Sequence, residues 1–502
     1  MLKVAPFAYF RHTSRRIGPP ILVLTLLAVL ARLPGINRPL VGNFATRNVV
    51  SAMVARNWAE GRATLWYPTV DCLAGEHRQW ILLEFPVSTY LTASLWKWLS
   101  GSLDAWGRGT SIGLIAASVA MIYLLVGRRH GPVAAAGAAF ALAVSPVSVV
   151  FGQSFMLEPS LVFFTVVAFY AQDRWLEGGR LCWLGLAAAA LALAILTKVY
   201  MLVLLLPLAV EAKTSLNLFG PASSRRRKAA LLAIALAVLP SLVWYAHAAT
   251  AAAPDGPYAE RVFYSVRQSA DVHRPPHPLL KTPDFYRQVL DDLASIVLTP
   301  VGFTIALAAF LHRSWRRYAP WLAALAVLIA GLPLKFYEMN YYWLPVLPAL
   351  CILAGLGWRQ VCRRLRLGGV ATALLALTVA VFSLRYSVKP AFVTPPEDRA
   401  VAAAGRAAGR LAAPDEPVVA MHGSTIDLLY YCDRPGWAVA PDTPELKTKL
   451  IELHGQKARW LVYVAGSDRP PRVLGELPVR LRGEGYTIHD LSRLPPRMGA
   501  QE

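Results

Sequence analysis

Long apolar stretches recur along the chain from residue 20 to residue 386, and short polar segments separate them. An α-helix needs about 20 apolar residues to cross the hydrocarbon core of a bilayer, and several of these stretches are only a little shorter. Because a spanning segment must satisfy its own backbone hydrogen bonds, each stretch is expected to be helical. The pattern predicts about 11 spans. They lie near 20–36, 108–127, 131–150, 159–176, 181–197, 199–212, 229–248, 295–311, 319–333, 341–357 and 369–386.

Composition narrows the class of protein. Hydrophobic residues make up 56% of the chain and charged residues 16%, with a mean hydropathy of +0.43. Soluble globular domains do not have such a composition, so the chain is expected to be a polytopic α-helical membrane protein. The net charge of +21 could suggest a nucleic-acid partner. The basic residues, however, lie in short runs between apolar segments, as in cytoplasmic loops, so we expect a lipid bilayer and no nucleic acid as partner.

The apolar pattern leaves the course of segment 81–100 open. The segment is apolar enough to span, but Glu84, Pro86 and Lys97 suit an interfacial or re-entrant helix. If the segment does not cross, the basic clusters after it fall on the side of the N-terminus, which satisfies the positive-inside rule. We therefore predict a multi-pass protein of the inner or plasma membrane, with a cytoplasmic N-terminus and an extracytoplasmic C-terminus. The first apolar run lacks a small-residue cleavage site, so we expect the first span to be retained.

Two domains follow from this topology. Residues 1–386 form the predicted membrane domain, with outer loops at 37–107 and 249–294. Residues 387–502 form a predicted small extracytoplasmic α/β domain, because apolar strands alternate there with helical segments. The strands are expected at 417–421 and 459–464 and the helices at 396–412 and 444–454. Within the first outer loop, apolar residues at helical spacing over 47–60 predict an amphipathic helix that lies on the membrane surface.

Two acidic residues, Glu84 and Glu158, lie where a carboxylate is unusual, and a third, Asp71, lies in the loop before Glu84. Glu84 and Glu158 adjoin apolar sequence, and burying a carboxylate is costly unless it is paired or functional. Each could instead end a helix at the water interface, beside a proline of the first turn. Asp71 could either form a turn or act chemically. Glu76 lies in a polar stretch and is expected to be solvated.

Several basic residues of the predicted outer face could neutralise a phosphate group. We select Arg47, Lys198 and Arg267 as the phosphate-binding residues. Lys198 interrupts an apolar hairpin, and the alternative is that it only extends its ammonium group to the interface. Tyr341 and Glu338 could line the mouth of a cavity, although a belt of interfacial aromatic residues explains much of their segment.

The chain gives no firm indication of a cofactor. His273 and His277 are four positions apart, but two prolines lie between them and exclude the helix on which such a pair would bind a metal. A divalent metal is therefore not indicated, and no metal ligand is predicted. The cysteines show no metal spacing, and a disulfide between Cys72 and Cys432 stays open.

The order of several short motifs resembles the GT-C membrane glycosyltransferases, in particular glycosyltransferase family 39, the protein O-mannosyltransferase and aminoarabinose-transferase type. The resemblance covers roughly residues 20 to 386. Its five stretches are "RNVVSAMVARNWAEG" (47–61), "YPTVD" (67–71) with "EFPVSTYL" (84–91), "SPVSVVFGQSFMLEPSLVFF" (145–164), "ILTKVYMLVLLLPL" (195–208) and "NYYWLPVLPAL" (340–350). The tail segment "LLYYCDRPGW" (428–437) is similar to a recurrent element of bacterial members with an outer α/β domain.

The resemblance implies a GT-C fold and the transfer of a sugar, a hexose or a pentose, from a polyprenyl-phosphate donor without a nucleotide sugar. The acceptor would be a lipid, a glycan or a protein on the outer face. An acidic residue of the first outer loop would act as base or orient the acceptor, and Glu158 would join it at the start of the fourth span. Metal dependence varies within the wider fold.

The chain departs from the family pattern at Val50, where many relatives have an aspartate. Glu84 and Asp71 are the local replacements, and the apolar neighbours of Glu84 suit a carboxylate that takes a proton near neutral pH. Glu158 would be the partner of the base or a clamp for the acceptor. Two other classes stay open. One is a transporter or flippase of lipid-linked sugars, which the missing inverted repeat disfavours. The other is a non-catalytic scaffold, which Val50 permits.

Overall fold

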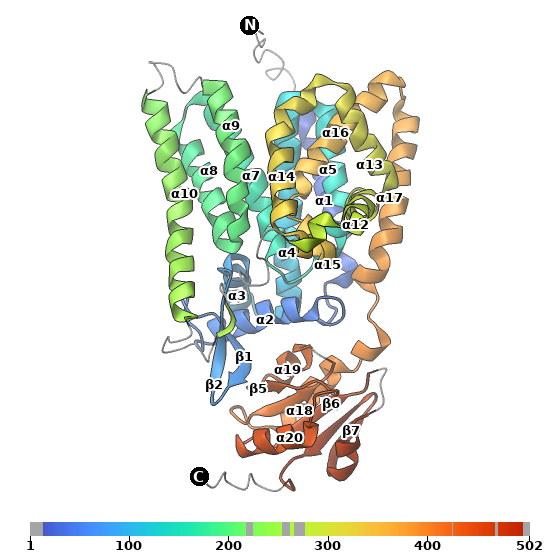
Figure 1. Ribbon diagram of the computed structural model, residues 1–502. Coiled ribbons are helices and arrows are strands. Elements are labelled where there is room, and N and C mark those ends of the chain that lie inside the picture. The colour runs from blue at the N-terminus through green and yellow to red at the C-terminus, as the bar shows by residue number, and fades with distance from the viewer. Residues whose placement is uncertain are drawn as a thin grey trace. The chain divides into compact units, whose positions relative to one another are not determined.

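The computed structural model describes residues 14–216, 224–253, 262–265, 277–423, 425–466 and 470–494 (Figure 1). Contacts between residues divide the chain into two compact units. Unit 1 comprises Met1–Ile36, Arg108–Ala246 and Ala270–Phe392, and unit 2 comprises Asn37–Gly107, His247–Ser269 and Val393–Glu502. Unit 1 is helical, and unit 2 contains the strands that the structure describes.

Unit 1 is built mainly from helices. Its α-helices are α1 (Ser14–Leu30), α4 (Leu103–His130), α5 (Pro132–Val144), α6 (Pro146–Phe151), α7 (Glu158–Gly178), α8 (Leu181–Thr197), α9 (Leu205–Leu216), α10 (Ser224–Ala251), α12 (Pro283–Asp292), α13 (Pro300–Leu307), α14 (Ala319–Gly331), α15 (Pro333–Glu338), α16 (Leu347–Arg364) and α17 (Gly369–Phe392). Shorter helical turns include η2 (Val199–Leu204) and η9 (Asn340–Trp343). Several helices begin with a proline in the first turn, where its missing N–H costs no helical hydrogen bond.

Among the described residues, four helices are long and apolar enough to cross a membrane. They are Gly18–Gly35, Leu103–His130, Ser224–Ala251 and Gly369–Asp398; the pair Pro283–Val297 and Pro300–Leu311, bent by 106°, adds a fifth if it is one span. The predicted apolar stretches are helical over most of their length, as the backbone requirement predicts, but 131–150 is divided at Ser145 and 295–311 between Val297 and Pro300. Several of these helices are too short to qualify by length alone, so the total of about 11 spans stays a prediction.

Small residues set the spacing of the central helices in unit 1. α5 packs closely against α16, and α7 packs against α8 and α9 (Figure 1). A Cβ atom added to Gly355 of α16 would lie 2.3 Å from the backbone oxygen of Ala134 in α5. One added to Gly137 of α5 would lie 2.8 Å from Cβ of Trp358. The two glycines therefore let the backbones of α5 and α16 approach, as small residues do between membrane helices.

Unit 2 contains a mixed sheet whose eight described strands come from three distant parts of the chain, in the order β3-β2-β1-β5-β4-β6-β8-β7. The strands are β1 (Thr69–Ala74), β2 (His77–Leu82), β3 (Val262–Ser265), β4 (Val418–Met421), β5 (Gly436–Ala438), β6 (Trp460–Val464), β7 (Val479–Gly483) and β8 (Tyr486–Asp490). β1 and β2 form an antiparallel hairpin, and β1 pairs in parallel with β5 at Cys72 and Gly436. β5, β4 and β6 are parallel neighbours, and β8 and β7 continue the sheet with antiparallel pairs.

The tail has the predicted α/β character. β4 and β6 fall within the predicted strands, and α18 (Val401–Leu411) and α20 (Leu446–Gly455) overlap the predicted helices. Helix α19 (Asp427–Cys432) lies between β4 and β5 along the chain. The pairing of β1 with β5 also groups residues 37–107 with the tail, whereas the sequence-based division places that loop with the membrane domain. The extracytoplasmic location of the tail stays a prediction.

Helix α2 (Ala45–Ala59) confirms the helix predicted at 47–60. Its polar residues are not turned toward water, however, because Asn48 and Asn57 are buried. α2 packs against β1, α19 and α3, the helix that covers Val87–Leu99. The Asn57 side chain donates a hydrogen bond to the backbone oxygen of Thr69 at 2.9 Å. The predicted amphipathic character is therefore wrong, since residues on all faces of α2 are buried. Its location on the membrane surface stays a prediction.

Candidate active site

A buried ion pair joins two helix ends in unit 1. Glu158 is the first residue of α7, and Lys198 directly follows the last residue of α8. α7 and α8 are joined by a short turn and pack together, so the start of α7 and the end of α8 meet. Nζ of Lys198 lies 3.3 Å from Oε1 of Glu158, and 5% and 4% of these side chains are exposed. Each charge also complements the partial charge of its own helix end.

Burial decides between the alternatives for these two residues. The Lys198 side chain is enclosed by protein, so its interpretation as a lysine that only reaches for the interface is wrong. Glu158 does stand in the first turn of α7, as the helix-end alternative predicts, and it is paired as well. Removing one partner of such a buried pair leaves an uncompensated charge, at a cost of about 3–5 kcal/mol.

One aromatic residue of η9, Tyr342, lies beside Lys198. Nζ of Lys198 lies 5.7 Å from the centroid of the Tyr342 ring, within the range of a cation–π contact. Tyr341 and Tyr342 are both buried, so these rings pack inside unit 1 and do not form an exposed interfacial belt. Glu338 is exposed at the end of α15. The placement of Tyr341 and Glu338 at a cavity mouth stays a prediction.

In unit 2 the structure brings Glu84 together with Arg47. Glu84 lies in the turn between β2 and α3, and Arg47 lies in the first turn of α2. Nη1 of Arg47 is 3.7 Å from Oε2 of Glu84, because α2 and α3 pack against each other. The residue that caps α3 is Pro86, so the interpretation of Glu84 as a helix cap is wrong. Val50, where the family resemblance predicts an aspartate, lies one turn beyond Arg47 and is half-buried.

Asp71 is buried in β1 and is held by three donors. Nη2 of Arg56 donates to Oδ2 at 2.7 Å, while Asn57 and Arg78 donate to Oδ1 at 3.2 and 3.3 Å. Arg56 also lies 3.0 Å from Asp433 of the tail. Asp71 therefore links α2, both strands of the hairpin and the tail. A carboxylate occupied in this way is poorly placed to take a proton from an acceptor.

Contacts inside unit 2 explain the tail motif at 428–437. The hydroxyls of Tyr430 and Tyr431 donate to the two carboxylate oxygens of Asp104 at 2.6 and 2.7 Å. Nε of Arg434 donates to the backbone oxygen of Ala412, just after α18, at 3.1 Å. The motif therefore fastens the start of α4 and the end of α18 to α19, which is a structural role.

Cys72 and Cys432 are both buried and both free, so the structure does not contain the disulfide that the sequence leaves open. Burial raises the pKa of each thiol to about 12. The negative charge of Asp71 acts in the same direction on Cys72. Both thiols are therefore expected to stay protonated at neutral pH.

Some of the residues singled out in the sequence belong to none of the ion pairs described above. Arg267, the third predicted phosphate ligand, and His273 lie outside the described residues. His277 is described, and its Nδ1 accepts a hydrogen bond from the backbone N–H of Leu279. Glu76 is exposed and lies 3.4 Å from the exposed Lys457, which confirms that it is solvated.

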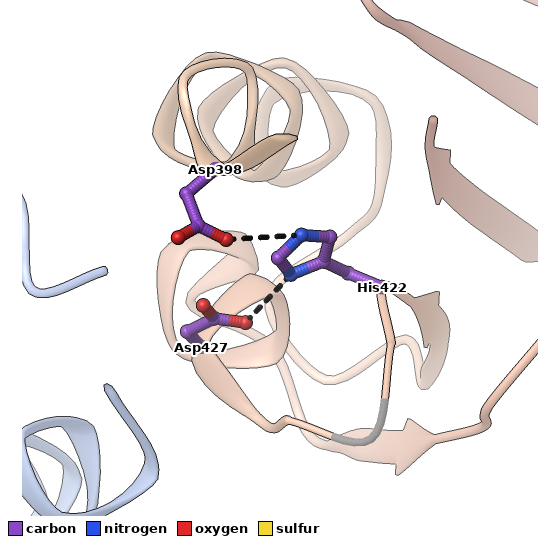
Figure 2. A group of neighbouring side chains, drawn as sticks. All are labelled: Asp398, His422 and Asp427. Carbon is purple, nitrogen blue, oxygen red and sulfur yellow. Dashed lines mark hydrogen bonds and ion pairs between the residues drawn. The ribbon is translucent and has the colours of Figure 1, made fainter. Parts of the chain in front are cut away.

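A cluster of acid and imidazole groups in unit 2 is missing from the sequence-based prediction. His422 lies between Asp398 and Asp427 (Figure 2). Nε2 is 3.4 Å from Oδ1 of Asp398, and Nδ1 is 3.1 Å from Oδ1 of Asp427. Burial lowers the pKa of His422, but the hydrogen bond to Asp427 and the two carboxylate charges raise it, and the net shift is upward. The signal that could have found it is a histidine directly after the apolar strand β4, with an aspartate five positions later.

The chain matches one family model. Residues 80–244, about a third of the chain, match the model described as dolichyl-phosphate-mannose-protein mannosyltransferase. A comparison with curated proteins gives no match.

Several solved structures are similar over most of the chain. ArnT from Cupriavidus metallidurans bound to undecaprenyl phosphate has a TM-score of 0.64 and 14% identity, over 94% of this chain and 98% of that one. The oligosaccharyltransferase of Archaeoglobus fulgidus in complex with Zn and sulfate has a TM-score of 0.58 and 12% identity, over 89% of this chain and 68% of that one. The arabinofuranosyltransferase AftD from Mycobacteria has a TM-score of 0.59 and 14% identity, over 94% of this chain and 40% of that one.

These identities are low, so the likeness to the solved structures establishes the fold. The fold is the one that the motifs predict, and the family model covers the segment that holds Glu84, Glu158 and Lys198. The recognition made from the sequence is therefore confirmed: the chain has the fold of the GT-C membrane glycosyltransferases, and its residues 80–244 match the mannosyltransferase family.

Proposed function

We propose that the protein is an integral-membrane glycosyltransferase that moves a sugar from a polyprenyl-phosphate donor to a hydroxyl group of a lipid, a glycan or a protein. The observation that carries this proposal is the buried pair of Glu158 and Lys198. Burying two charges among apolar helices is expensive, and such charges in membrane proteins usually have a task. Undecaprenyl phosphate and dolichol phosphate, with which the ArnT and Archaeoglobus structures were solved, support a donor of the same chemistry.

The reaction has two electrostatic requirements. The bond between C1 of the sugar and the phosphate oxygen breaks, and the charge left on the phosphate must be met by cations in a site poor in water. A new bond forms between C1 and the acceptor oxygen, and a base must take the proton of the acceptor hydroxyl. Lys198 and Arg47 can supply positive charge, and each lies beside an acid. A phosphate that binds either cation would compete with that acid and release its carboxylate.

The geometry favours distinct roles for the three acids. Glu84 is our candidate for the base, because it follows an apolar run of the sequence and lies beside a cation, with Oε2 at 3.7 Å from Nη1 of Arg47. Glu158 is proposed as the partner of the base or the clamp for the acceptor. Asp71, held by three donors, is proposed to position α2 and the hairpin. Arg267 stays a proposed phosphate ligand on the basis of the sequence.

The test is sugar transfer by purified protein in liposomes that contain polyprenyl phosphate with a radiolabelled sugar. We compare Glu84→Gln, Glu158→Gln and Asp71→Asn with the matched control Glu76→Gln, an exposed acid of the same loop. Loss of a general base should lower kcat by about 10²–10⁴-fold, and the control should keep full activity. Full transfer by all three acid variants would overturn the assignment.

The same liposomes separate the alternative classes. A transporter or flippase would move the labelled lipid to the opposite leaflet without transferring its sugar. A non-catalytic scaffold would bind the lipid without turnover. Either result with the unmodified chain would overturn the transferase proposal in favour of the corresponding class.

We also propose a cytoplasmic N-terminus and an extracytoplasmic tail in the plasma membrane. The regular placement of basic clusters supports this orientation. The test is a cysteine at Ser102, in a chain whose exposed Cys182 is replaced by serine. A membrane-impermeant maleimide should label Ser102→Cys from outside intact cells, and labelling only from the inside would overturn the orientation.

A further inference from the structure

The cluster of Asp398, His422 and Asp427 takes no part in the proposed transfer reaction. One potential ligand atom from each of the three residues lies within 4.8 Å of the others. The three residues come from three elements of unit 2: the turn before α18, the residue after β4, and the first residue of α19. We propose that this cluster binds a divalent cation of the zinc type.

The spacing of the ligand atoms suits such an ion. Two ligands that are each about 2.1 Å from a tetrahedral zinc ion lie about 3.4 Å apart. Nε2 of His422 and Oδ1 of Asp398 are 3.4 Å apart, so the pair already has the length of one edge of that tetrahedron. On the other side of the ring, Oδ1 of Asp427 is 3.1 Å from Nδ1. A carboxylate in this position accepts the second ring N–H and orients a metal-bound imidazole.

The second oxygen of Asp427 provides an independent argument. Among the described residues, Oδ2 of Asp427 is buried without a hydrogen-bond partner, and only 1% of its side chain is exposed. A buried carboxylate oxygen normally has a donor or a cation beside it. The cluster also carries a net charge of −1 even when the imidazole is protonated. A divalent ion on Nε2 of His422 would offset this excess of negative charge beside the buried oxygen.

The position in the fold agrees with a binding site. β4 lies between β5 and β6, and all three strands are parallel. The next strand along the chain, β5, lies on one side of β4, and β6 lies on the other, so the strand order reverses at β4. Ligands of open α/β sheets bind outside the carboxyl ends of the strands at such a point. His422 directly follows the last residue of β4 and thus lies at this end. Asp398 has 12% of its side chain exposed, which leaves a route for the ion and for a water ligand.

The ligand set favours zinc over magnesium or calcium. Imidazole nitrogen together with carboxylate oxygen is a usual zinc donor set, whereas magnesium and calcium prefer oxygen donors alone. An ion held here would also tie the segment Pro396–Asp398 to the end of β4. This segment precedes α18, so the ion would stabilise the start of the tail.

The test measures zinc in the purified full chain after removal of any affinity tag. Protein dialysed against zinc and then against metal-free buffer is analysed by mass spectrometry for metal per chain, and affinity is measured by competition with a chromophoric chelator. We expect about one zinc per chain more in the unmodified protein than in His422→Gln. Asp427→Asn should weaken binding by about 10–100-fold, as loss of an orienting carboxylate does. Far-UV circular dichroism and gel filtration show whether each variant is folded.

The matched control is His454→Gln, since His454 of the same unit contacts the backbone oxygen of Ala458 and no acid of the cluster. This variant should keep the zinc. The proposal is overturned if the folded, unmodified chain holds no zinc after exposure to it, or if His422→Gln retains the same amount. Equal affinity for magnesium and zinc would also overturn it.

Discussion

Replacing Arg56 with methionine tests whether the ion cluster around Asp71 holds unit 2 together. The Arg56 side chain is 10% exposed and reaches three acceptors. These are Oδ2 of Asp71 at 2.7 Å, the backbone oxygen of Tyr430 at 3.1 Å and Oδ1 of Asp433 at 3.0 Å. Its guanidinium also lies 4.8 Å from the centroid of the Tyr430 ring. Methionine fills most of the volume but removes the charge.

The expected loss of stability depends on the hydrogen-bond donors that Asp71 keeps when Arg56 is replaced. Removing one partner of a buried ion pair costs about 3–5 kcal/mol. Asp71 keeps Asn57 and Arg78 as donors, so we expect the lower end, about 3 kcal/mol. A unit of this size loses about 2–4 °C of Tm for each kcal/mol, which gives a fall of about 6–12 °C. In a cycle with Asp71→Asn, the double variant should be less destabilised than the sum of the single variants by about 1–3 kcal/mol.

The assay is thermal unfolding in one detergent, followed by tryptophan fluorescence and checked by gel filtration. The matched control is Arg62→Met, because Arg62 is 33% exposed and pairs with the exposed Glu60. Such a surface pair contributes about 0–1 kcal/mol, so Tm should change by less than about 4 °C. The reasoning fails if Arg56→Met leaves Tm unchanged, or if its effect and that of Asp71→Asn simply add.

Two further predictions concern close packing and thiol chemistry in unit 2. Gly436→Ala should lower Tm, because a Cβ atom there would lie 1.9 Å from a backbone oxygen of β4; Gly475→Ala, which meets open space, should not, and equal Tm values would contradict this argument. Cys72 and Cys432 should resist iodoacetamide at pH 8, because a pKa of about 12 leaves little thiolate, whereas the exposed Cys182 should react. Mass spectrometry of the alkylated peptides gives the extent of reaction, and alkylation of all three at one rate would contradict it.

The helices could be predicted because their signal is local. An apolar run such as 159–176 contains within itself the backbone donors and acceptors that a helix in lipid needs, and α7 follows. The tail strands also have a local signal, because β4 and β6 are continuous apolar runs in the sequence. Each of their positions is buried in the structure. The pairing of β1 with β5 has no such signal. It joins Cys72 to Gly436 through the shape of the sheet, and neither segment specifies the other.

The candidate site could be predicted only where a charged residue interrupts an apolar run, because a buried charge is unusual. Glu158 and Lys198 both stand out from apolar sequence, and the structure pairs them. Asp71 stands out less, and the sequence does not show that Arg56, among several arginines, is its partner. Which arginine reaches Asp71 depends on the packing of α2 against β1, and this tertiary contact has no local sequence signal. His422 was missed because only Asp427 is close to it in the sequence, whereas its other acidic neighbour, Asp398, belongs to the turn before α18.

The mixed sheet of unit 2 also sets an order of events during synthesis. Arg56 and its contact Tyr430 are separated by 374 positions. At about 5–20 residues per second, the ribosome needs about 20–75 s to produce the second partner after the first. Throughout this interval the hairpin of β1 and β2 has an unpaired edge, which is the feature that invites wrong strand pairing. The edge of β1 is therefore paired only after α17, the last helix before the tail, has been made.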